Sequence, residues 1–427
     1  MKILLINPYG PIPIPEENWR EYRFTIIGNH LASLGHEVIW YTSSFSHHFK
    51  KQRSDHWKDI EINSLFKIRL VPTPGYKSNR SLNRLIRDWV FGFKVYNERK
   101  NRISKPDLII YGENPLTFGY AGYRLAKYFK VPVICDQGDL WPEFIINSFP
   151  KKSQKLVKLL FFPVFFNRKM IYNRLDGLFS LAEPYLNIPL SIAPNLKNKP
   201  HVIIYNGIDV IKFRETKPDK INLFAETLPI KLNNHVWFVF AGTLGPSYDI
   251  LNLLKVAALL YEESNQSIKI IIAGDGPLKK EVNEFIKKHD GDIVTYLGQL
   301  NPENLAELYQ ICDVGLSTYT QYSNVEMCDK FYDYTAAGLS IINSLTGEVS
   351  GVIEKNDIGI NYLAGETSQL YQAIVSLSLD QIKSKEMASR SFELGMTYDK
   401  NIQIKKLGPF INEVMNSFNN LPNKNTE

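Results

Sequence analysis

The sequence predicts an α/β protein made of two doubly wound domains that face each other across a cleft. Short apolar, β-branched runs alternate with longer amphipathic stretches along most of the chain, and this alternation is typical of parallel sheets joined by crossover helices. The length of 427 residues exceeds one ordinary hydrophobic core, which favours two or three domains.

The first domain is expected to span residues 1–208. Its apolar runs do not alternate in polarity, as Leu108–Tyr111 illustrates, and such runs are typical of strands buried on both faces. Helical patterns cover Phe24–Leu34 and Gly119–Phe129. The predicted strands are Lys2–Pro8, Glu37–Thr42, Ile68–Pro72, Asp107–Gly112, Val131–Gln137, Gly177–Ala182 and Val202–Asn206.

Residues 209–234 show no strong period and contain Pro218 and Pro229, so we interpret them as a linker. The β/α rhythm then restarts in a second domain, residues 235–400, with helical patterns over Ile250–Tyr261 and Asn304–Gln310. Residues 401–427 form a last amphipathic stretch and a frayed polar tail. The predicted strands of the second domain are Trp237–Ala241, Ile268–Ala273, Ile293–Leu297, Val314–Ser317, Ser340–Asn343 and Ile358–Tyr362.

Composition narrows the function classes. With 44% hydrophobic and 22% charged residues, the chain is not collagen-like, a coiled coil or wholly disordered. A net charge of +6 is too small to indicate nucleic-acid binding, but it is compatible with binding to an anionic substrate or membrane surface. The first apolar run stops at Asn7-Pro8, so we expect no signal peptide, and no apolar run is long enough to span a bilayer. We therefore expect a cytoplasmic protein.

The thiols and imidazoles do not predict a metal site or a disulfide scaffold. Three cysteines, Cys135, Cys312 and Cys328, are unpatterned and are expected to be free thiols in a reducing compartment. The histidines near Asp55 lack the spacing of metal ligands. We expect neither a cofactor nor a metal.

Two glycine-rich segments follow predicted strands and precede helical patterns. Glycines in Gly242–Gly245 would let the backbone approach a phosphate, which a helix N-terminus would also bind. Gly274-Asp275-Gly276-Pro277 has the same placement. The alternative for both segments is a tight turn, with a cap in the second.

A third segment, Glu326–Gly338, carries a cation and a carboxylate at helical spacing. Lys330 and Asp333 are three residues apart and share one helix face. An ammonium would neutralise phosphate and a carboxylate would take ribose hydroxyls, so the pair is suited to a nucleotide sugar. Spacing alone also allows a surface salt bridge.

Two features of the first domain point to an acceptor and to a membrane. Asp139 follows a predicted strand and is placed to bind or deprotonate a sugar hydroxyl, although an Asx-type cap is the alternative. Residues 151–174 combine an apolar, aromatic centre with lysines and arginines on both sides. Such a segment can lie in the interface of an anionic membrane, or it can be a buried helix with a solvated basic rim.

Together these motifs resemble the retaining glycosyltransferases of family 4, which have the GT-B fold, over nearly the whole chain. The segment Asp139–Glu143 also resembles the bacterial amino-sugar transferases of surface polysaccharide assembly. The other motifs that carry the resemblance are Tyr205–Phe213, Ala241–Gly245, Ala273–Pro277, Lys330–Gly338 and Gly347-Glu348 followed by Gly359.

The resemblance implies roles for individual residues. Lys330 would take phosphate charge and Asp333 would bind ribose, while Asp139 and Glu113 would lie on the acceptor side. The final helix, Ile402–Phe418, would return to the N-terminal domain. The remaining residues of the implied donor site are Gly242, Thr243, Asp275, Gly298, Gln299 and Glu326.

The chain departs from the family pattern at two places in the second domain, and its N-terminal loop lacks the usual run of glycines. The family has two glutamates separated by seven residues, but here Val325 and Asp333 stand at those positions, with Glu326 one place later. The arginine and lysine that the family has after the first strand of the second domain are absent, and Tyr248, Asp249 and Ile250 stand there. Lys330 would therefore carry more of the phosphate charge.

The sequence thus predicts an enzyme that transfers a sugar, expected to be an N-acetyl sugar, from a UDP-linked donor. Lys330 and Asp139 are the predicted catalytic residues. The acceptor would be a hydroxyl of a lipid-linked glycan in lipopolysaccharide or other surface polysaccharide synthesis, reached at the inner face of the membrane through residues 151–174. The alternatives are a non-hydrolysing UDP-sugar epimerase and a catalytically degenerate partner subunit.

Overall fold

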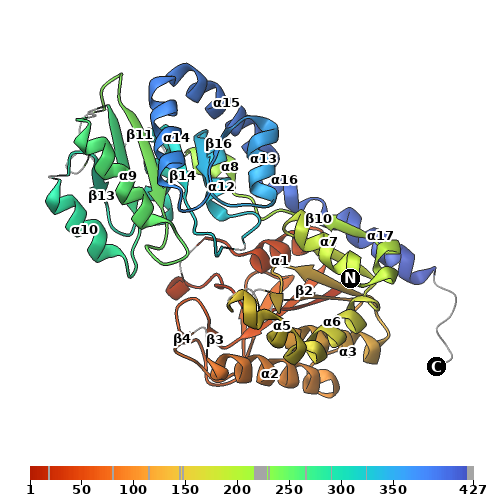
Figure 1. Cartoon of the computed structure of the whole chain (residues 1–427). Helices are drawn as coiled ribbons and strands as arrows, with labels where there is room; N and C mark the ends of the chain where they lie inside the picture. The colour runs from red at the N-terminus through yellow and green to blue at the C-terminus, as the bar shows by residue number, and fades with distance from the viewer. Residues whose placement is uncertain are drawn as a thin grey trace. The chain divides into compact units, whose positions relative to one another are not determined.

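The computed structural model describes residues 1–17, 20–78, 81–113, 116–143, 146, 149–215, 228, 231–264, 267–289, 291–323 and 325–420. Its contacts divide the chain into two units. Unit 1 combines Met1–Tyr205 with the segment that begins at Ile404, and unit 2 is Asn206–Gln403. Each unit contains a parallel sheet with helices on both faces (Figure 1), so the predicted fold class is confirmed.

Within the described residues, the sheet of unit 1 has the strand order β10-β9-β8-β7-β1-β2-β6-β5. All neighbours are parallel except β5, which pairs antiparallel with β6 at the edge. The strand order reverses direction between β1 and β7. The strands of this sheet are β1 (Lys2–Ile6), β2 (Glu37–Ser43), β5 (Lys58–Glu61), β6 (Phe66–Val71), β7 (Leu108–Gly112), β8 (Val133–Gln137), β9 (Gly177–Ser180) and β10 (His201–Ile203), beside a small ribbon of β3 (Phe45–Ser46) and β4 (Lys51–Gln52).

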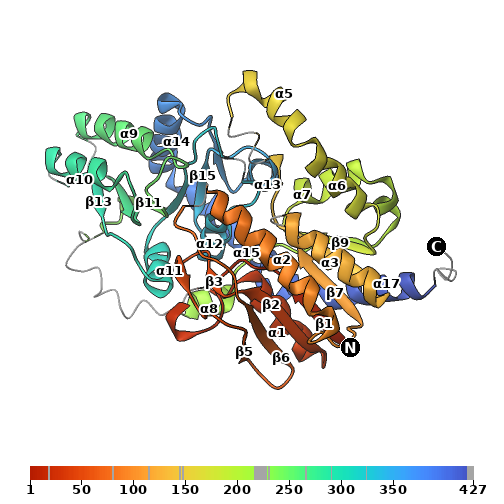
Figure 2. The same cartoon turned by 90° about the horizontal axis from the view of Figure 1, so that it is seen from below.

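Two hydrophobic clusters, one on each face of this sheet, hold the helices of unit 1. One cluster packs under α2, α3, α6 and α7, and Figure 2 shows α2 and α3 side by side over β7. The other packs under α1 and α17. The helices are α1 (Arg23–Ser33), α2 (Leu82–Asn97), α3 (Leu116–Phe129), α5 (Lys151–Leu160), α6 (Phe162–Tyr172), α7 (Glu183–Ile192) and α17 (Leu407–Asn419), with 3-10 turns at Pro15–Glu17, Glu98–Lys100 and Pro194–Asn198.

Unit 2 has a wholly parallel sheet among its described residues, with the order β13-β12-β11-β14-β15-β16 and a reversal between β11 and β14. Its strands are β11 (Val236–Ala241), β12 (Ile268–Ala273), β13 (Val294–Tyr296), β14 (Val314–Ser317), β15 (Ser340–Asn343) and β16 (Gly359–Asn361). Its helices are α8 (Val210–Glu215), α9 (Ile250–Glu262), α10 (Lys279–Lys288), α11 (Pro302–Ile311), α12 (Asp329–Ala337), α13 (Glu348–Asn356), α14 (Thr367–Leu379), α15 (Gln381–Thr397) and α16 (Lys400–Ile404).

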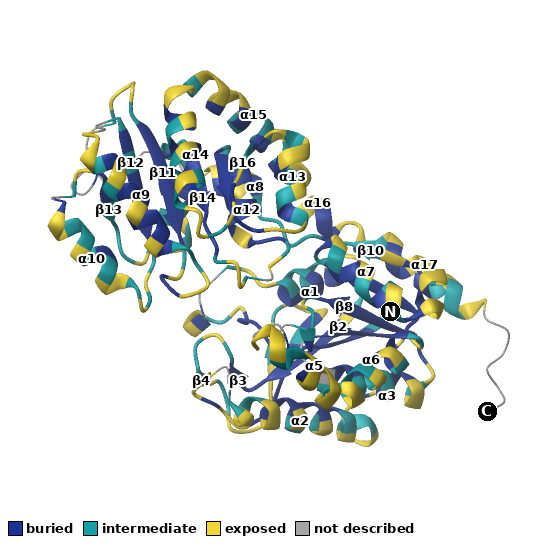
Figure 3. Cartoon of the chain, viewed as in Figure 1, coloured by how far each residue is buried: buried dark blue, intermediate teal, exposed yellow. Residues whose placement is uncertain are grey.

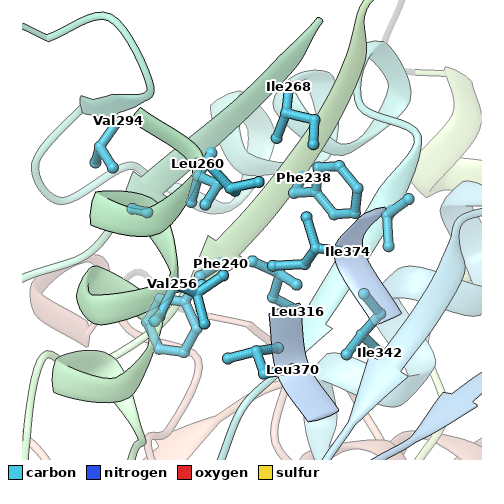
Figure 4. Packing of buried hydrophobic residues seen from close by; sticks show 14 of the residues in the cluster. Phe238, Phe240, Val256, Leu260, Ile268, Val294, Leu316, Ile342, Leu370 and Ile374 are labelled. Atoms are coloured by element: carbon cyan, nitrogen blue, oxygen red, sulfur yellow. The ribbon is translucent and has the colours of Figure 1, made fainter. Parts of the chain in front are cut away.

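The core of unit 2 lies between the sheet and helices α9 and α14. Phe238 and Phe240 of β11 contribute to it from the sheet, and Leu260 and Ile374 contribute from the helices (Figure 4). Burial of such side chains is worth roughly 1.5–3 kcal/mol each. In both units of Figure 3 the strands are mostly dark blue, that is buried, whereas the helices that cover them carry both buried and exposed residues.

Every strand that the sequence predicts is present, with ends within three residues of the prediction. The prediction missed β5, because its residues Lys58–Glu61 are mostly polar and exposed at the sheet edge. It also missed the break at Phe161 that divides residues 151–172 into α5 and α6. The predicted linker contains α8, which belongs to unit 2, while its residues 216–227, 229 and 230 lie outside the described residues.

The last helix packs on unit 1. The ring of Phe410 in α17 meets that of Phe179 in β9 at 5.9 Å. Gly177 of the same strand leaves room for this helix, since a Cβ there would approach Val414 to 2.6 Å. The predicted tail from residue 421 onward lies outside the described residues.

Candidate functional site: a cation at the carboxyl edge of unit 2

The loops that follow β11, β12 and β13 are joined by backbone hydrogen bonds. Gly242 N–H donates to Ala273 O at 2.9 Å, and Gly274 N–H donates to Gly298 O at 2.7 Å. A Cβ on Gly274 would lie 1.8 Å from the Gly242 carbonyl oxygen, so only glycine allows this approach. Three of the predicted glycines therefore lie together at one edge of the sheet.

Lys330 lies at the same edge, in the first turn of α12. Its side chain is 6% exposed. The ammonium lies 3.9 Å from the ring centroid of Tyr248, 5.2 Å from that of Tyr319 and 5.0 Å from that of Phe240. A Cβ on Gly242 would come within 2.6 Å of the Lys330 Nζ. The glycine thus leaves the space that the ammonium occupies.

Among the described residues, Lys330 forms no hydrogen bond and no ion pair. Cation–π contacts offset part of the cost of removing an ammonium from water, by about 0.5–2 kcal/mol each. A buried charge without an opposite charge remains unfavourable. The strand order of unit 2 reverses next to it, between β11 and β14, where sheets of this kind bind ligands. This arrangement is suited to an anion.

Asp333 lies one turn after Lys330 and is 4% exposed. Because both side chains are buried and Lys330 makes no ion pair with a described residue, the surface salt bridge that spacing alone allowed is not formed. Asp333 and Lys330 instead come from one buried face of α12. The structure therefore brings together the predicted phosphate and ribose positions.

Glu326 contacts the start of α13. Its Oε2 accepts the N–H of Glu348 at 3.0 Å, and a Cβ on Gly347 would lie 2.1 Å from the same oxygen. Gly347 has φ +85°, a conformation that favours glycine. One carboxylate oxygen of Glu326 is thus committed to the first turn of α13.

The other predicted donor residues lie at the surface of this edge. Thr243 and Gln299 are exposed. Asp275 accepts the Gly276 N–H at 2.8 Å and pairs with Lys279 at 3.7 Å. Asp275 is therefore held within the turn that precedes α10, and it does not cap that helix.

In unit 1, Glu113 follows β7 at the reversal of strand order and is buried. The Cys135 thiol lies 3.9 Å from its Oε2, and the Tyr172 hydroxyl donates to Gln137 nearby at 2.5 Å. Burial raises the pKa of Glu113 to about 8, against a smaller opposing effect of Arg168. At neutral pH Glu113 is therefore mostly protonated, and it can donate a proton as well as accept one.

Asp139 is exposed in the loop after β8, and its carbonyl accepts from Gln137 Nε2. The same loop is held by Arg168 of α6, which is buried and forms a two-point ion pair with Glu143 at 2.5 and 2.7 Å. Arg168 also donates to the Trp141 carbonyl. The sequence had placed Arg168 in a basic rim; the structure gives it an internal role.

Sequence reasoning did not assign Tyr248 and Tyr319 to the site. Their rings lie 4.7 Å apart and their backbones form an isolated β-bridge. The sequence indicates Tyr248 only as a residue that stands where the family has a basic one. Its place next to Lys330 depends on pairing between loops about 70 residues apart, for which the sequence carries no local signal.

Within the described ranges, no cluster of three or more His, Cys, Asp or Glu side chains is arranged to hold a metal ion. Over the same part of the chain, no helix combines the length and apolar character needed to cross a membrane. The described cysteines Cys135, Cys312 and Cys328 are all free and buried.

The two parallel-sheet units define a GT-B fold. Residues 22–212 match the model of the family described as Glycosyltransferase Family 4, and residues 229–393 match the model described as Glycosyl transferases group 1. The chain belongs to this family of glycosyltransferases.

Individual relatives are distant. A chitobiosyldiphosphodolichol beta-mannosyltransferase of Candida glabrata is 24% identical over 144 residues, which cover 32% of each chain. The match thus spans about a third of that relative's own length. Sucrose-phosphate synthase from Thermosynechococcus elongatus has a TM-score of 0.70 at 15% identity, covering 97% of this chain and 99% of the other. HepE of Anabaena, in complex with UDP, has a TM-score of 0.65 at 15% identity, covering 96% and 100%.

Proposed function

We propose that the protein is a retaining glycosyltransferase that moves a sugar from a UDP-sugar to a hydroxyl of a lipid-linked glycan. The observation that carries the proposal is the buried Lys330 ammonium, which has aromatic neighbours but no anionic partner among the described residues. The solved structure of HepE with UDP supports the choice of nucleotide. The diphosphodolichol named for the fungal relative supports a lipid-linked acceptor.

In the proposed reaction, the bond from the sugar C1 to the diphosphate oxygen breaks and a bond from C1 to the acceptor oxygen forms. Lys330 stabilises the negative charge that grows on the leaving diphosphate, together with the Thr243 backbone amide, because the Gly242 N–H is already donated to the Ala273 carbonyl. The leaving phosphate takes the proton of the attacking hydroxyl on the same face of the sugar, so configuration is retained. Asp333 binds the ribose, and Asp139 with Glu113 serves the acceptor side.

We further propose an N-acetyl sugar and a surface polysaccharide, such as lipopolysaccharide, as donor group and product. This assignment depends on the resemblance of Asp139–Glu143 to amino-sugar transferases. The ion pair between Glu143 and Arg168 supports it only by showing that the loop has a defined conformation.

The reaction would take place at the inner face of the cell membrane, where residues 151–174 would contact anionic lipid. Leu160 and Phe166 on α5 and α6 are 71% and 64% exposed, and α5 contains four lysines and no acidic residue. Arg168 is buried and is not part of this surface. Flotation with anionic vesicles tests this contact: Lys155→Glu should weaken binding, whereas Lys127→Glu, at an exposed lysine of α3, should have a much smaller effect.

A donor screen by thermal shift, followed by transfer assays on membranes that contain acceptor, tests the proposed function. A UDP-sugar that binds the native state should raise the melting temperature, and NMR of the product should show the donor's anomeric configuration. An inverted product would refute retention. Binding of UDP without transfer would favour the partner-subunit alternative, and 2-epimerisation of a UDP-sugar without acceptor would favour the epimerase.

A further inference from the structure

A second group of cations lies at the carboxyl edge of the unit 1 sheet, on loops that follow β1, β2 and β6 and on the inward face of α2. We call it the edge cluster. It consists of Tyr9, His47, Lys50, Tyr76, Arg84, Arg87 and Asp88.

The edge cluster is held together by aromatic and polar contacts. Arg87 is fully buried, with its guanidinium 4.3 Å from the ring centroid of Tyr9 and 5.5 Å from that of Tyr76. Arg84 Nε donates to the Tyr9 hydroxyl at 3.0 Å, and that hydroxyl donates to Asp88 at 2.9 Å. Lys50 lies over the Tyr76 ring at 4.8 Å.

Among its described residues, the edge cluster contains three cations and one carboxylate in a partly buried site. Arg87 Nε lies 3.1 Å from Asp88, and burial raises the pKa of Asp88 to about 6. Lys50, Arg84 and Arg87 together carry more positive charge than this one carboxylate can balance. The pKa of Lys50 is lowered by burial and by repulsion from Arg84 and Arg87. Like charges held together in a partly desolvated site are unfavourable, and an added anion relieves them.

The edge cluster adjoins the predicted acceptor loop. The Arg84 guanidinium lies 5.2 Å from the ring centroid of Trp141, two residues after Asp139. Lys50 and Arg84 are half-buried rather than enclosed, so their charged ends can reach a ligand at the surface of unit 1.

The opposite face of α2 is apolar and exposed. Trp89 is 63% exposed and Phe93 is 68% exposed, and Figure 3 colours parts of α2 yellow. We call this face the outer stripe; it consists of Leu82, Leu85, Ile86, Trp89 and Phe93. One helix thus carries cations on its inner face and exposed apolar side chains on its outer face, as helices that lie at a lipid interface do.

We propose that the edge cluster binds a phosphate of the lipid-linked acceptor while the outer stripe of α2 enters the lipid layer beside it. Arginine suits this task because its guanidinium binds phosphate oxygens at two points. The inference rests on the proposed function for its acceptor, and it adds the anionic group by which that acceptor is recognised.

Calorimetry with inorganic diphosphate tests the edge cluster. Titrations are made with UDP present and also in a Lys330→Met background, so that the site in unit 2 does not contribute. Diphosphate should bind, and Arg84→Gln and Lys50→Gln should each weaken it about tenfold or more, while Lys127→Gln has little effect. Absence of diphosphate binding, or equal loss in all three variants, would overturn the inference.

Vesicle flotation distinguishes a lipid phosphate from a free one. Phosphatidylcholine vesicles that contain phosphatidic acid should bind the protein more tightly than phosphatidylcholine alone, and Arg84→Gln should reduce that difference. Trp89→Ser should reduce vesicle binding without changing diphosphate binding. Diphosphate binding without any phosphatidic acid preference would overturn the assignment to lipid.

The same titrations separate the two proposals. If the wild-type protein does not bind UDP, the result counts against the proposed function. Normal UDP binding without diphosphate binding counts against the edge cluster alone.

Discussion

Replacing Lys330 by methionine should weaken UDP binding strongly while changing the stability of the free protein little. Methionine keeps most of the side-chain volume but removes the ammonium. The free protein loses cation–π contacts with three rings, a cost of roughly 1.5–6 kcal/mol in total. It also loses the penalty of a buried charge that has no ion-pair partner among the described residues, so the two effects oppose each other.

For UDP binding, no opposing effect offsets the loss of the ammonium. Hydrogen bonds between charged groups are worth about 1.5–3 kcal/mol, so Lys330→Met should raise the Kd for UDP by roughly 10- to 100-fold. Uridine lacks phosphate, and its Kd should stay nearly constant. Calorimetry with both ligands gives the comparison, and thermal unfolding gives the stability.

Lys279→Met is the matched control, because Lys279 is an exposed lysine at the start of α10, next to the loop that follows β12. It should change the Kd for UDP much less. Equal weakening of UDP and uridine by Lys330→Met, or an unchanged Kd for UDP, would refute the assignment of the ammonium to phosphate.

Further substitutions test other parts of the structure. Gly242→Ala places a Cβ within 2.6 Å of a buried ammonium. It should lower the free energy of unfolding by about 1–3 kcal/mol and weaken UDP binding. Gly351→Ala is the control and should leave stability unchanged or raise it, because a Cβ there meets nothing within 4 Å. The pKa of Glu113 is raised from 4.5 to about 8, so its protonated form contributes stability that is fully present below pH 4.5 and is lost as pH rises to about 8. Glu113→Gln should therefore remove a slope of up to about 1.4 kcal/mol per pH unit from the plot of unfolding free energy against pH. An unchanged slope in denaturant unfolding would contradict the burial argument. Arg168→Met leaves Glu143 without its partner and should cost about 2–4 kcal/mol by thermal unfolding, with part of the loss recovered when Glu143→Gln is added; no loss would show that the ion pair does not hold the loop.

The sequence alone determined the architecture and the approximate location of the candidate site in unit 2. Strands buried on both faces read as continuous apolar runs, and β12 and β14 appear at the predicted residues. Glycines that follow such strands must lie at the carboxyl edge, because parallel strands end together. The helical spacing of Lys330 and Asp333 placed both on one face of α12.

Only the tertiary structure decided what surrounds those residues. Helix periodicity cannot distinguish an exposed pair from a buried one, and the burial of Lys330 depends on Tyr248 and Tyr319 from two distant loops. The pairing of Arg168 with Glu143 reassigned a residue that local charge had placed at the surface. The edge cluster joins α2 to loops after three strands. Local sequence patterns indicate the direction of a side chain within its own helix or strand. These contacts instead depend on which strands are neighbours in each sheet, because that order brings distant loops together.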